Sequence, residues 1–577
     1  MPRQARARNG GRDVPLTHTT PHEVHSVMRT PTRRTVLGAA LGAAGAGLVA
    51  ACSSDSMKGM DHSAMNHGAT GSTGSATGSA TASGAAPTGF VAPNGPEVAA
   101  AEARRNPGPE RKVALTATET TLDLGGRTVR SWAYGDRLPG QEVRATVGDT
   151  LALTLANHLP QPTSLHWHGL ALRNDMDGVP GVTQAAVKAG GSFDYRFALT
   201  HPGTYWLHPH SGVQQDRGLY VPLIVEDPKE PLRYDKEWVV VLDDWVDGVD
   251  GSTPDAVLAE LAKGMGGTGG MGGTDHSGGS GHDMPGMPGM GSASGAESGA
   301  TGPSRMLMGA SSPLLGGDAG DVAHPFHLVN GRLATAPETF TAKPGDRIRI
   351  RLINAAGDTA YRVALGGHEL TVTHTDGFPV EQATTRALLL GMGERYDVLV
   401  TAQDGVFPLT ALAEGKNATA LAVLRTGGGA APDASVRPAE LDGKLVTAGQ
   451  LKAGPDVRLS AKSPDRTVGL ELTGGMAKAD WAFNGRPYDP AQRYPVAAGE
   501  RVRLEFRNST AMWHPVHLHG HSFALPGGGP RKDTAIVLPG ATLAVDFDAD
   551  NPGLWMVHCH NVYHAETGMM TVLGYQA

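Results

Sequence analysis

The sequence predicts an all-β protein built from three related β-sandwich domains. Three observations support this: the chain of 577 residues is too long for one hydrophobic core, it is rich in turn-forming Gly (79) and Pro (40) with few periodic helical stretches, and one strand pattern occurs three times. Hydrophobic residues make up 40% of the chain, which is enough to build such cores. The formal net charge of −8 comes without a basic block and argues against a nucleic-acid partner.

The repeated pattern lies at 148–157, 345–354 and 499–508. Each copy starts with Gly followed by an acid, alternates apolar and polar residues, and ends in Asn. Alternation with period two after a turn is typical of a strand with one face on a core. Because the copies stand a whole domain apart, they imply three β-sandwiches, which we place at 111–230, 236–430 and 440–577.

The first 52 residues look like a signal region. The pair Arg33-Arg34 precedes an apolar run from Val36 to Ala51, which is short for a membrane span and is followed directly by Cys52. The twin arginine resembles a Tat signal and the cysteine resembles a lipoprotein box. We therefore expect export through the Tat route, followed by anchoring at the cell surface through a lipid on Cys52 or by secretion. An ordinary signal peptide, with Cys52 incidental, is the alternative.

Two segments are too poor in large apolar residues to form a core. Residues 53–110 are expected to be a flexible N-terminal tether, and residues 264–320 a Met/Gly-rich insertion in the second domain. A short helix should lead into the insertion, with Thr253 as N-cap, Pro254 at its first position and Gly264 beyond its end.

Four histidine-rich segments carry the chemistry. The first domain contains His166-Trp167-His168 and His208-Pro209-His210, and the third contains two longer motifs. The longer motifs run from His514 through His517 to His519, and from His558-Cys559-His560 through His564 to Met569. A His-x-His pair on an extended strand turns both imidazoles to one face. Four such pairs give more imidazoles than one metal ion can use.

The segment His558-Cys559-His560 indicates which metal is bound. Strand alternation turns the two histidines to one face and the thiolate to the other. Cys559 can then join His514, His564 and a weak axial Met569, which is the ligand set of a blue-copper electron-transfer site. Met570 competes for the axial position, although Met569 matches the spacing. The same short stretch of backbone thus connects two metal sites.

Together the four segments resemble the copper signatures of the multicopper oxidases, a family that includes laccases, cuprous oxidases and bacterial copper-resistance oxidases. The resemblance runs from about residue 112 to the C-terminus and implies cupredoxin-like Greek-key sandwiches with four copper ions. It implies that His514, Cys559, His564 and Met569 hold the type 1 copper, and that His166 and His517 hold the type 2 copper. The type 3 pair would be held by His168, His208 and His560 on one ion and by His210, His519 and His558 on the other. The middle domain would be a spacer and buttress, with His368 and His374 structural or exposed.

The same resemblance suggests an acid for proton delivery. Asp177 occupies the position where relatives carry such an acid, but Asp177-Gly178 is also a turn dipeptide, and both interpretations stay open. Relatives also carry an acid directly after the last type 1 histidine. Here Ala565 takes that position and Glu566 follows, so no role is assigned to Glu566.

The implied activity is one-electron oxidation of a small donor at type 1 copper, coupled to four-electron reduction of O2 to water at the trinuclear cluster. Cys559, His558, His560 and Asp177 are the expected catalytic residues. The expected donor is a phenol, an aromatic amine or Cu(I). Cu(I) is included because the Met-rich stretches 57–67 and 265–290 offer thioethers, which prefer Cu(I). A role in copper tolerance and a monomeric state are expected. A surface copper store with incidental oxidase activity is the alternative, and a copper nitrite reductase a remote one.

Overall fold

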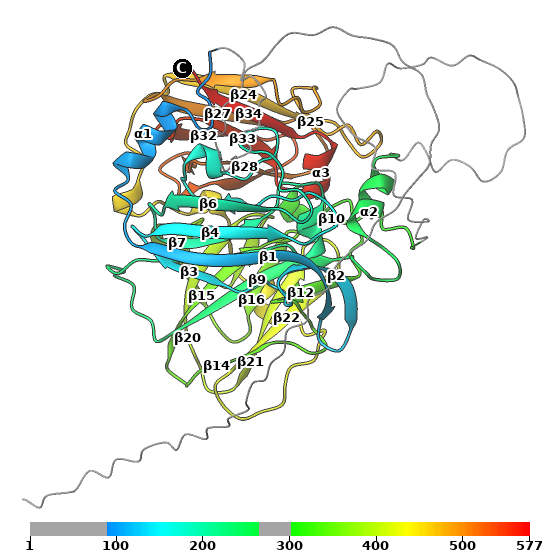
Figure 1. The fold of residues 1–577 in the computed structure, drawn as a ribbon. Helices are drawn as coiled ribbons and strands as arrows, with labels where there is room; N and C mark the ends of the chain where they lie inside the picture. Colours follow the sequence, from blue (N-terminus) through cyan, green and yellow to red (C-terminus); the bar gives the residue numbers. More distant parts are fainter. Residues whose placement is uncertain (1–88, 265–301) are drawn as a thin grey trace, which may run out of the picture. The chain divides into compact units, whose positions relative to one another are not determined.

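The computed structural model describes residues 89–264 and 302–577. The predicted signal region with Cys52, most of the predicted tether and both Met-rich stretches lie outside the described residues. None of the described helices has the length and apolarity needed to cross a membrane. The strands can be followed by label and colour in Figure 1.

The first sandwich pairs a sheet of order β2-β1-β4-β6 with one of order β3-β8-β7-β5. Its elements are α1 (Pro96–Arg104), β1 (Glu110–Asp123), β2 (Thr128–Tyr134), β3 (Val143–Thr146), β4 (Thr150–Asn157), β5 (His166–His168), η1 (Asn174–Met176), β6 (Ser192–Ala198), β7 (Gly203–His208), η2 (Gln214–Arg217) and β8 (Val221–Glu226).

The second sandwich is larger and combines the sheet β13-β12-β9-β15-β20-β17-β18 with the sheet β14-β22-β21-β16-β19-β23. Its elements are β9 (Lys236–Trp245), α2 (Pro254–Leu261), β10 (Ser311–Ser312), η4 (Pro313–Leu315), β11 (Gly317–Asp318), β12 (Phe326–Val329), β13 (Arg332–Leu333), β14 (Thr339–Thr341), β15 (Arg347–Asn354), β16 (Tyr361–Leu365), β17 (Leu370–Thr375), β18 (Phe378–Thr385), β19 (Ala387–Leu390), β20 (Arg395–Thr401), β21 (Val406–Ala413), β22 (Ala418–Arg425), η5 (Ala439–Asp442), β23 (Leu445–Val446), η6 (Ala448–Gln450) and η7 (Pro455–Val457).

The third sandwich combines the sheet β25-β24-β27-β32-β29-β30 with the sheet β26-β34-β33-β28-β31. Its elements are β24 (Arg466–Thr473), β25 (Ala482–Phe483), β26 (Arg493–Val496), β27 (Arg501–Asn508), β28 (His514–Leu518), β29 (Phe523–Ala524), β30 (Arg531–Lys532), β31 (Thr534–Val537), β32 (Thr542–Asp548), β33 (Leu554–Cys559), α3 (Val562–Thr567) and β34 (Met570–Tyr575). The all-β prediction is confirmed.

The repeated sequence pattern forms the same structure three times, as β4, β15 and β27. Each strand pairs in parallel with one neighbour (β1, β9 and β24) and antiparallel with another (β6, β20 and β32). The closing asparagines Asn157, Asn354 and Asn508 are buried, and each donates from its side chain to two main-chain carbonyls. Each side-chain oxygen accepts a main-chain N–H two residues on. A common role explains why the same residue closes each copy.

The predicted segment boundaries need three corrections. Residues 89–110 are not tether, because α1 packs its Val98 into the core and Phe90 bridges to Gln576. Within the predicted insertion, residues 311–318 form the β10–β11 hairpin. Residues 440–446 belong to the second sandwich, since β23 pairs in parallel with β19. The predicted helix before the insertion is confirmed as α2, where the Thr253 side chain accepts the Ala256 N–H.

The amide of Asn174 in η1 joins the first sandwich to β33 of the third. It donates to the carbonyl oxygen of Leu554 at 2.6 Å and accepts the Leu554 N–H at 2.8 Å. Asn174 is fully buried, and a Cβ on Gly553 would lie 2.4 Å from its side chain. This pairing fixes the start of the strand that carries Cys559.

We predict that Asn174→Ala destabilises the protein by about 2 kcal/mol or more, because the substitution leaves a buried N–H and a buried C=O of Leu554 without partners. Chemical denaturation of the copper-free protein measures the change. Asn174→Asp keeps the acceptor but places a buried carboxylate oxygen against the Leu554 carbonyl, so it should destabilise the protein at least as much. Equal stability of Asn174→Ala and wild type would contradict this role.

Candidate metal centres

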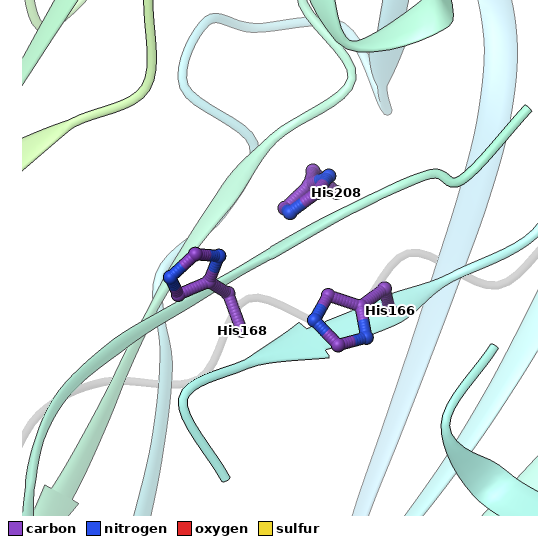
Figure 2. Close-up of side chains that lie close together, drawn as sticks. All are labelled: His166, His168 and His208. Atoms are coloured by element: carbon purple, nitrogen blue, oxygen red, sulfur yellow. The ribbon is translucent and has the colours of Figure 1, made fainter. Parts of the chain in front are cut away.

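Eight buried or nearly buried imidazoles gather between the first and third sandwiches. His166, His168 and His208 come from β5 and β7, and Figure 2 shows their rings near one another. The others follow from the ends of β7, β28 and β33: His210, His517, His519, His558 and His560. Donor atoms in overlapping groups of three lie within 4.8 Å of one another, such as His166 with His210 and His519, and His517 with His519 and His558. The structure therefore joins all four predicted His-x-His pairs into one cluster.

In several of these rings one nitrogen contacts a main-chain carbonyl oxygen at the edge of the cluster. The Nδ1 atoms of His166, His208 and His517 lie 2.9, 3.1 and 2.9 Å from the carbonyl oxygens of Asp177, Pro209 and Asp533. Their Nε2 atoms are buried without any hydrogen-bond partner, as is Nε2 of His210. Since buried polar atoms are normally paired, these nitrogens fit metal ions at the centre of the cluster.

His168 has the opposite orientation. Its Nε2 lies 3.0 Å from Oδ1 of Asp533 and 3.1 Å from Oγ1 of Thr534, while its Nδ1 lies 3.2 Å from Nε2 of His560. The inward donor of His168 is therefore Nδ1, and a carboxylate fixes the tautomer from the far side.

Asp533 is in turn paired with a cation of the second sandwich. Arg395, fully buried, donates to both carboxylate oxygens at 2.7 Å. Burial alone would raise the pKa of Asp533, but the guanidinium lowers it well below its ordinary value. The carboxylate therefore stays ionised and can accept a hydrogen bond from the Nε2–H group of His168.

Seven histidines of the cluster have pKa values below the ordinary value. Burial is the main cause that lowers the pKa of each, and neighbouring rings add to it in most cases; this applies to His168, His208, His210, His517, His519, His558 and His560. A neutral imidazole is the form that binds a metal ion.

A second, smaller centre surrounds Cys559. Its Sγ lies 3.6 Å from Nδ1 of His514 and 3.7 Å from Nδ1 of His564, and the two nitrogens are 3.1 Å apart. All three residues are fully buried, and Cys559 is free. Two imidazoles and a thiolate that converge in this way fit one copper ion.

Partners outside this centre hold both histidines. Nε2 of His514 lies 2.8 Å from Oγ1 of Thr510, and Nε2 of His564 lies 2.7 Å from Oδ2 of Asp321. Trp481 packs against His564 at 4.2 Å between ring centroids. Burial lowers the pKa of His564, but the hydrogen bond with Asp321 and the proximity of Cys559 outweigh it and raise this pKa to about 10.

Asp177 lies at the edge of the imidazole cluster and is fully buried. Its Oδ2 is 2.9 Å from Nδ1 of His519. Its Oδ1 is 3.2 Å from Nδ1 of His166, but the two atoms are not aligned for a hydrogen bond. Asp177 also belongs to a turn, since its N–H donates to Asn174 and Gly178 has a φ of +83°. The predicted turn is therefore present, and the carboxylate lies against two histidines of the cluster.

Sequence reasoning missed Asp321, Thr510, Trp481, Asp533 and Arg395. No motif marks them. Asp321, Asp533 and Trp481 meet a histidine from a distant part of the chain, and Arg395 acts through Asp533. Thr510 lies only four residues before His514 but belongs to no histidine motif. The middle domain, expected to be a spacer and buttress, contributes contacts at both centres: Arg395 contacts Asp533, Asp321 contacts His564, and Gly393 leaves no room for a Cβ beside His168 and His560.

His368 and His374 lie apart from both centres. Nδ1 of His368 lies 2.8 Å from the Gly366 carbonyl oxygen, and its Nε2 accepts the Gln403 N–H. His374 lies 3.4 Å from a guanidinium nitrogen of Arg349.

Comparison with known proteins gives consistent matches. Family models described as multicopper oxidase match residues 116–230, 301–429 and 462–576. The chain is 46% identical to multicopper oxidase MmcO of Mycobacterium tuberculosis, over 83% of this chain and 89% of the relative. It is 28% identical to a copper resistance protein A homolog of Pseudomonas syringae, over 79% of this chain and 90% of that relative. The crystal structure of a multi-copper oxidase from Pseudomonas thermotolerans superposes with a TM-score of 0.58 at 27% identity. The match covers 81% of this chain and 99% of the crystallised one.

We predict that the copper-free protein loses stability as the pH falls below about 6.5, the ordinary pKa of histidine. The cluster histidines have lowered pKa values in the folded state, so below that pH the unfolded chain binds more protons. Each histidine then contributes up to about 1.4 kcal/mol per pH unit. The raised pKa of His564 adds nothing below pH 6.5, where the folded and unfolded states are both protonated, whereas between pH 8 and 6.5 it increases stability as the pH falls. Denaturant titrations between pH 8 and pH 5 measure the slope.

The matched control is His208→Gln, which removes one of the titrating groups and should reduce that slope. A stability that is flat between pH 7 and pH 5 would contradict the prediction.

Proposed function

The chain belongs to the multicopper oxidase family, and on that premise we propose which residues hold its copper ions and which donors it oxidises. It is an oxidoreductase with four copper ions, one of type 1, one of type 2 and two of type 3. Bound copper supplies one-electron oxidation of a donor at the type 1 site and four-electron reduction of O2 to water at the other three ions.

We propose His514, Cys559, His564 and Met569 as the type 1 ligands. The convergence of Cys559 with His514 and His564 supports the first three. Met569 is fully buried, its N–H donates to the carbonyl of His564, and its carbonyl accepts the Cys559 N–H. Met570 packs instead against a separate apolar cluster that includes Val179, which favours Met569.

The eight imidazoles would hold the other three ions. We assign His166 and His517 to type 2 copper, and to type 3 copper the sets His168, His208, His560 and His210, His519, His558. Ring contacts support these sets, with centroids 4.9 Å apart for His168 and His560 and 4.9 Å for His210 and His558. The observation that carries the proposal is the run His558-Cys559-His560, whose main chain joins the two centres directly.

Asp177 is proposed as the acid that delivers protons to the cluster. Its burial, its contact with Nδ1 of His519 and the unpaired Oδ1 support this role. A carboxylate with one free oxygen can take up a proton without first losing a hydrogen bond.

The electron donor is proposed to be Cu(I) or a phenol or aromatic amine. Cu(I) is supported by the soft thioethers of the Met-rich stretches, and by relatives that include copper resistance proteins. Phenols are supported by relatives described as laccases. A role in copper tolerance follows from the first alternative.

We propose that the chain is an exported monomer. The twin arginine at Arg33-Arg34 and Cys52 after the apolar run support Tat export and a lipid anchor, with secretion as the alternative. One chain supplies all proposed ligands, which supports a monomer. N-terminal sequencing and the intact mass of the mature protein test the anchor.

We expect copper-loaded protein to show the intense thiolate-to-copper absorption and to consume O2 with a methoxyphenol or with Cu(I). Cys559→Ser should lose this absorption, one copper ion per chain and the turnover, because serine replaces the soft thiolate. Side-by-side rates with the two donors identify the better substrate. Copper binding without O2 consumption by the wild type would favour a copper store.

We expect Asp177→Asn to lower kcat at least about tenfold, as loss of a general acid does, and to leave the blue absorption intact. Asp175→Asn is the matched control, because Asp175 lies in the same turn but pairs with Arg173. Unchanged turnover of Asp177→Asn would remove the proton-delivery role and leave Asp177 as a turn residue.

A further inference from the structure

Asp358 is a fully buried carboxylate in the second sandwich, on the loop between β15 and β16. Four donors converge on its two oxygens. These are the N–H groups of Asp321 at 3.1 Å and Val322 at 3.0 Å, the side-chain amide of Asn561 at 2.6 Å and Nζ of Lys416 at 2.5 Å. Neither centre described above contains Asp358.

The donors from Asp321 and Asn561 lead to the same histidine. The Asp321 side chain holds Nε2 of His564 at 2.7 Å. The Asn561 side-chain oxygen caps α3 and accepts the N–H groups of Tyr563 and His564. Asp358 therefore connects a residue that holds the imidazole of His564 with a residue that holds its main chain. The hydrogen bonds form a closed ring of four residues: Asp358, Asp321, His564 and Asn561.

The surroundings keep Asp358 in a single position. Lys416 also donates to the carbonyl oxygen of Asp358 at 3.1 Å and to Oγ1 of Thr359 at 2.9 Å. Asp244 accepts the N–H of Asp358 at 3.1 Å. Gly320, with a φ of +152°, comes so close that a Cβ would lie 2.6 Å from Oδ2 of Asp358. A carboxylate that is both ion-paired and fully hydrogen-bonded is suited to holding other groups in place.

We propose that Asp358 is a positioning residue that fixes the Asp321 carboxylate against His564 and thereby sets the reduction potential of the type 1 site from the second sandwich. The inference rests on the proposed role of His564 as a type 1 ligand. A carboxylate that accepts the outer N–H of a ligand imidazole increases its donation to the metal, which favours the oxidised ion. Loosening this contact should therefore raise the potential.

The test is Asp358→Asn. Asparagine has one acceptor oxygen, so its NH2 group must face one of the four donors. We expect the reduction potential of the type 1 site to be higher in Asp358→Asn than in wild type, and also higher in Asp321→Asn. The double variant should show no further rise beyond Asp321→Asn alone, because the two residues act through one contact. Redox titration of the blue absorption measures all three proteins.

A readout without copper accompanies the titration. In copper-free Asp358→Asn, the amides of Val322, Tyr563 and His564 should exchange with solvent faster than in wild type. The substitution weakens the hydrogen bonds that Asp358 accepts from the 321–322 main chain and from Asn561. If wild type is not blue, the type 1 assignment fails, whereas hydrogen exchange still tests the anchor. Unchanged exchange at these amides would overturn the proposal.

Two further variants separate positioning from simple destabilisation. Asp397→Asn is the matched control, since Asp397 is a buried carboxylate of the same sandwich paired with Arg349 and Arg351. It should lower stability and leave the type 1 potential unchanged. Gly320→Ala displaces Asp358 without removing its charge and should raise the potential, which keeps the test available if Asp358→Asn does not fold. A potential equal to wild type in both Asp358→Asn and Gly320→Ala would contradict the proposal.

Discussion

The alternation of side chains along β33 is the constraint around which the molecule is arranged. His558 and Cys559 are the last residues of the strand and His560 follows it, so a thiolate and two imidazoles leave the same backbone in opposite directions. The thiolate meets His514 and His564 within the third sandwich. The imidazoles can be used only if another part of the chain brings partners to them, and β5 and β7 of the first sandwich do so.

This arrangement buries charge and polarity at the contacts between sandwiches. Arg395 and Asp533 form a fully buried pair behind His168, and Lys416 and Asp358 form another behind Asp321. Unpaired charges in such places would be costly, whereas paired and hydrogen-bonded ones hold their neighbours in one geometry. The second sandwich supplies Arg395 to the first pair and both residues of the second. It provides no copper ligand in our assignment, yet it orients a histidine at each centre.

Groups behind the imidazole rings of the cluster direct their free nitrogens inward. Main-chain carbonyls next to His166, His208 and His517 leave the Nε2 atoms of these rings facing inward. The carboxylate of Asp533 does the same from the other side of His168, whose Nδ1 faces inward. The orientation of each of these rings is thus decided by what lies behind it, and the inward nitrogens are directed toward the place of the metal ions.

The sequence alone predicted the strands and the candidate ligand types, because both depend on neighbours a few residues apart. The three copies ending in Asn157, Asn354 and Asn508 predicted three sandwiches, and spacing around Cys559 predicted its group of ligands. Only the tertiary structure decided the rest. Asp321 is 243 residues from His564, and Asp533 is 365 from His168. Contacts at such separations leave no periodic signal, since they depend on how whole sandwiches pack and on which buried charges must find partners.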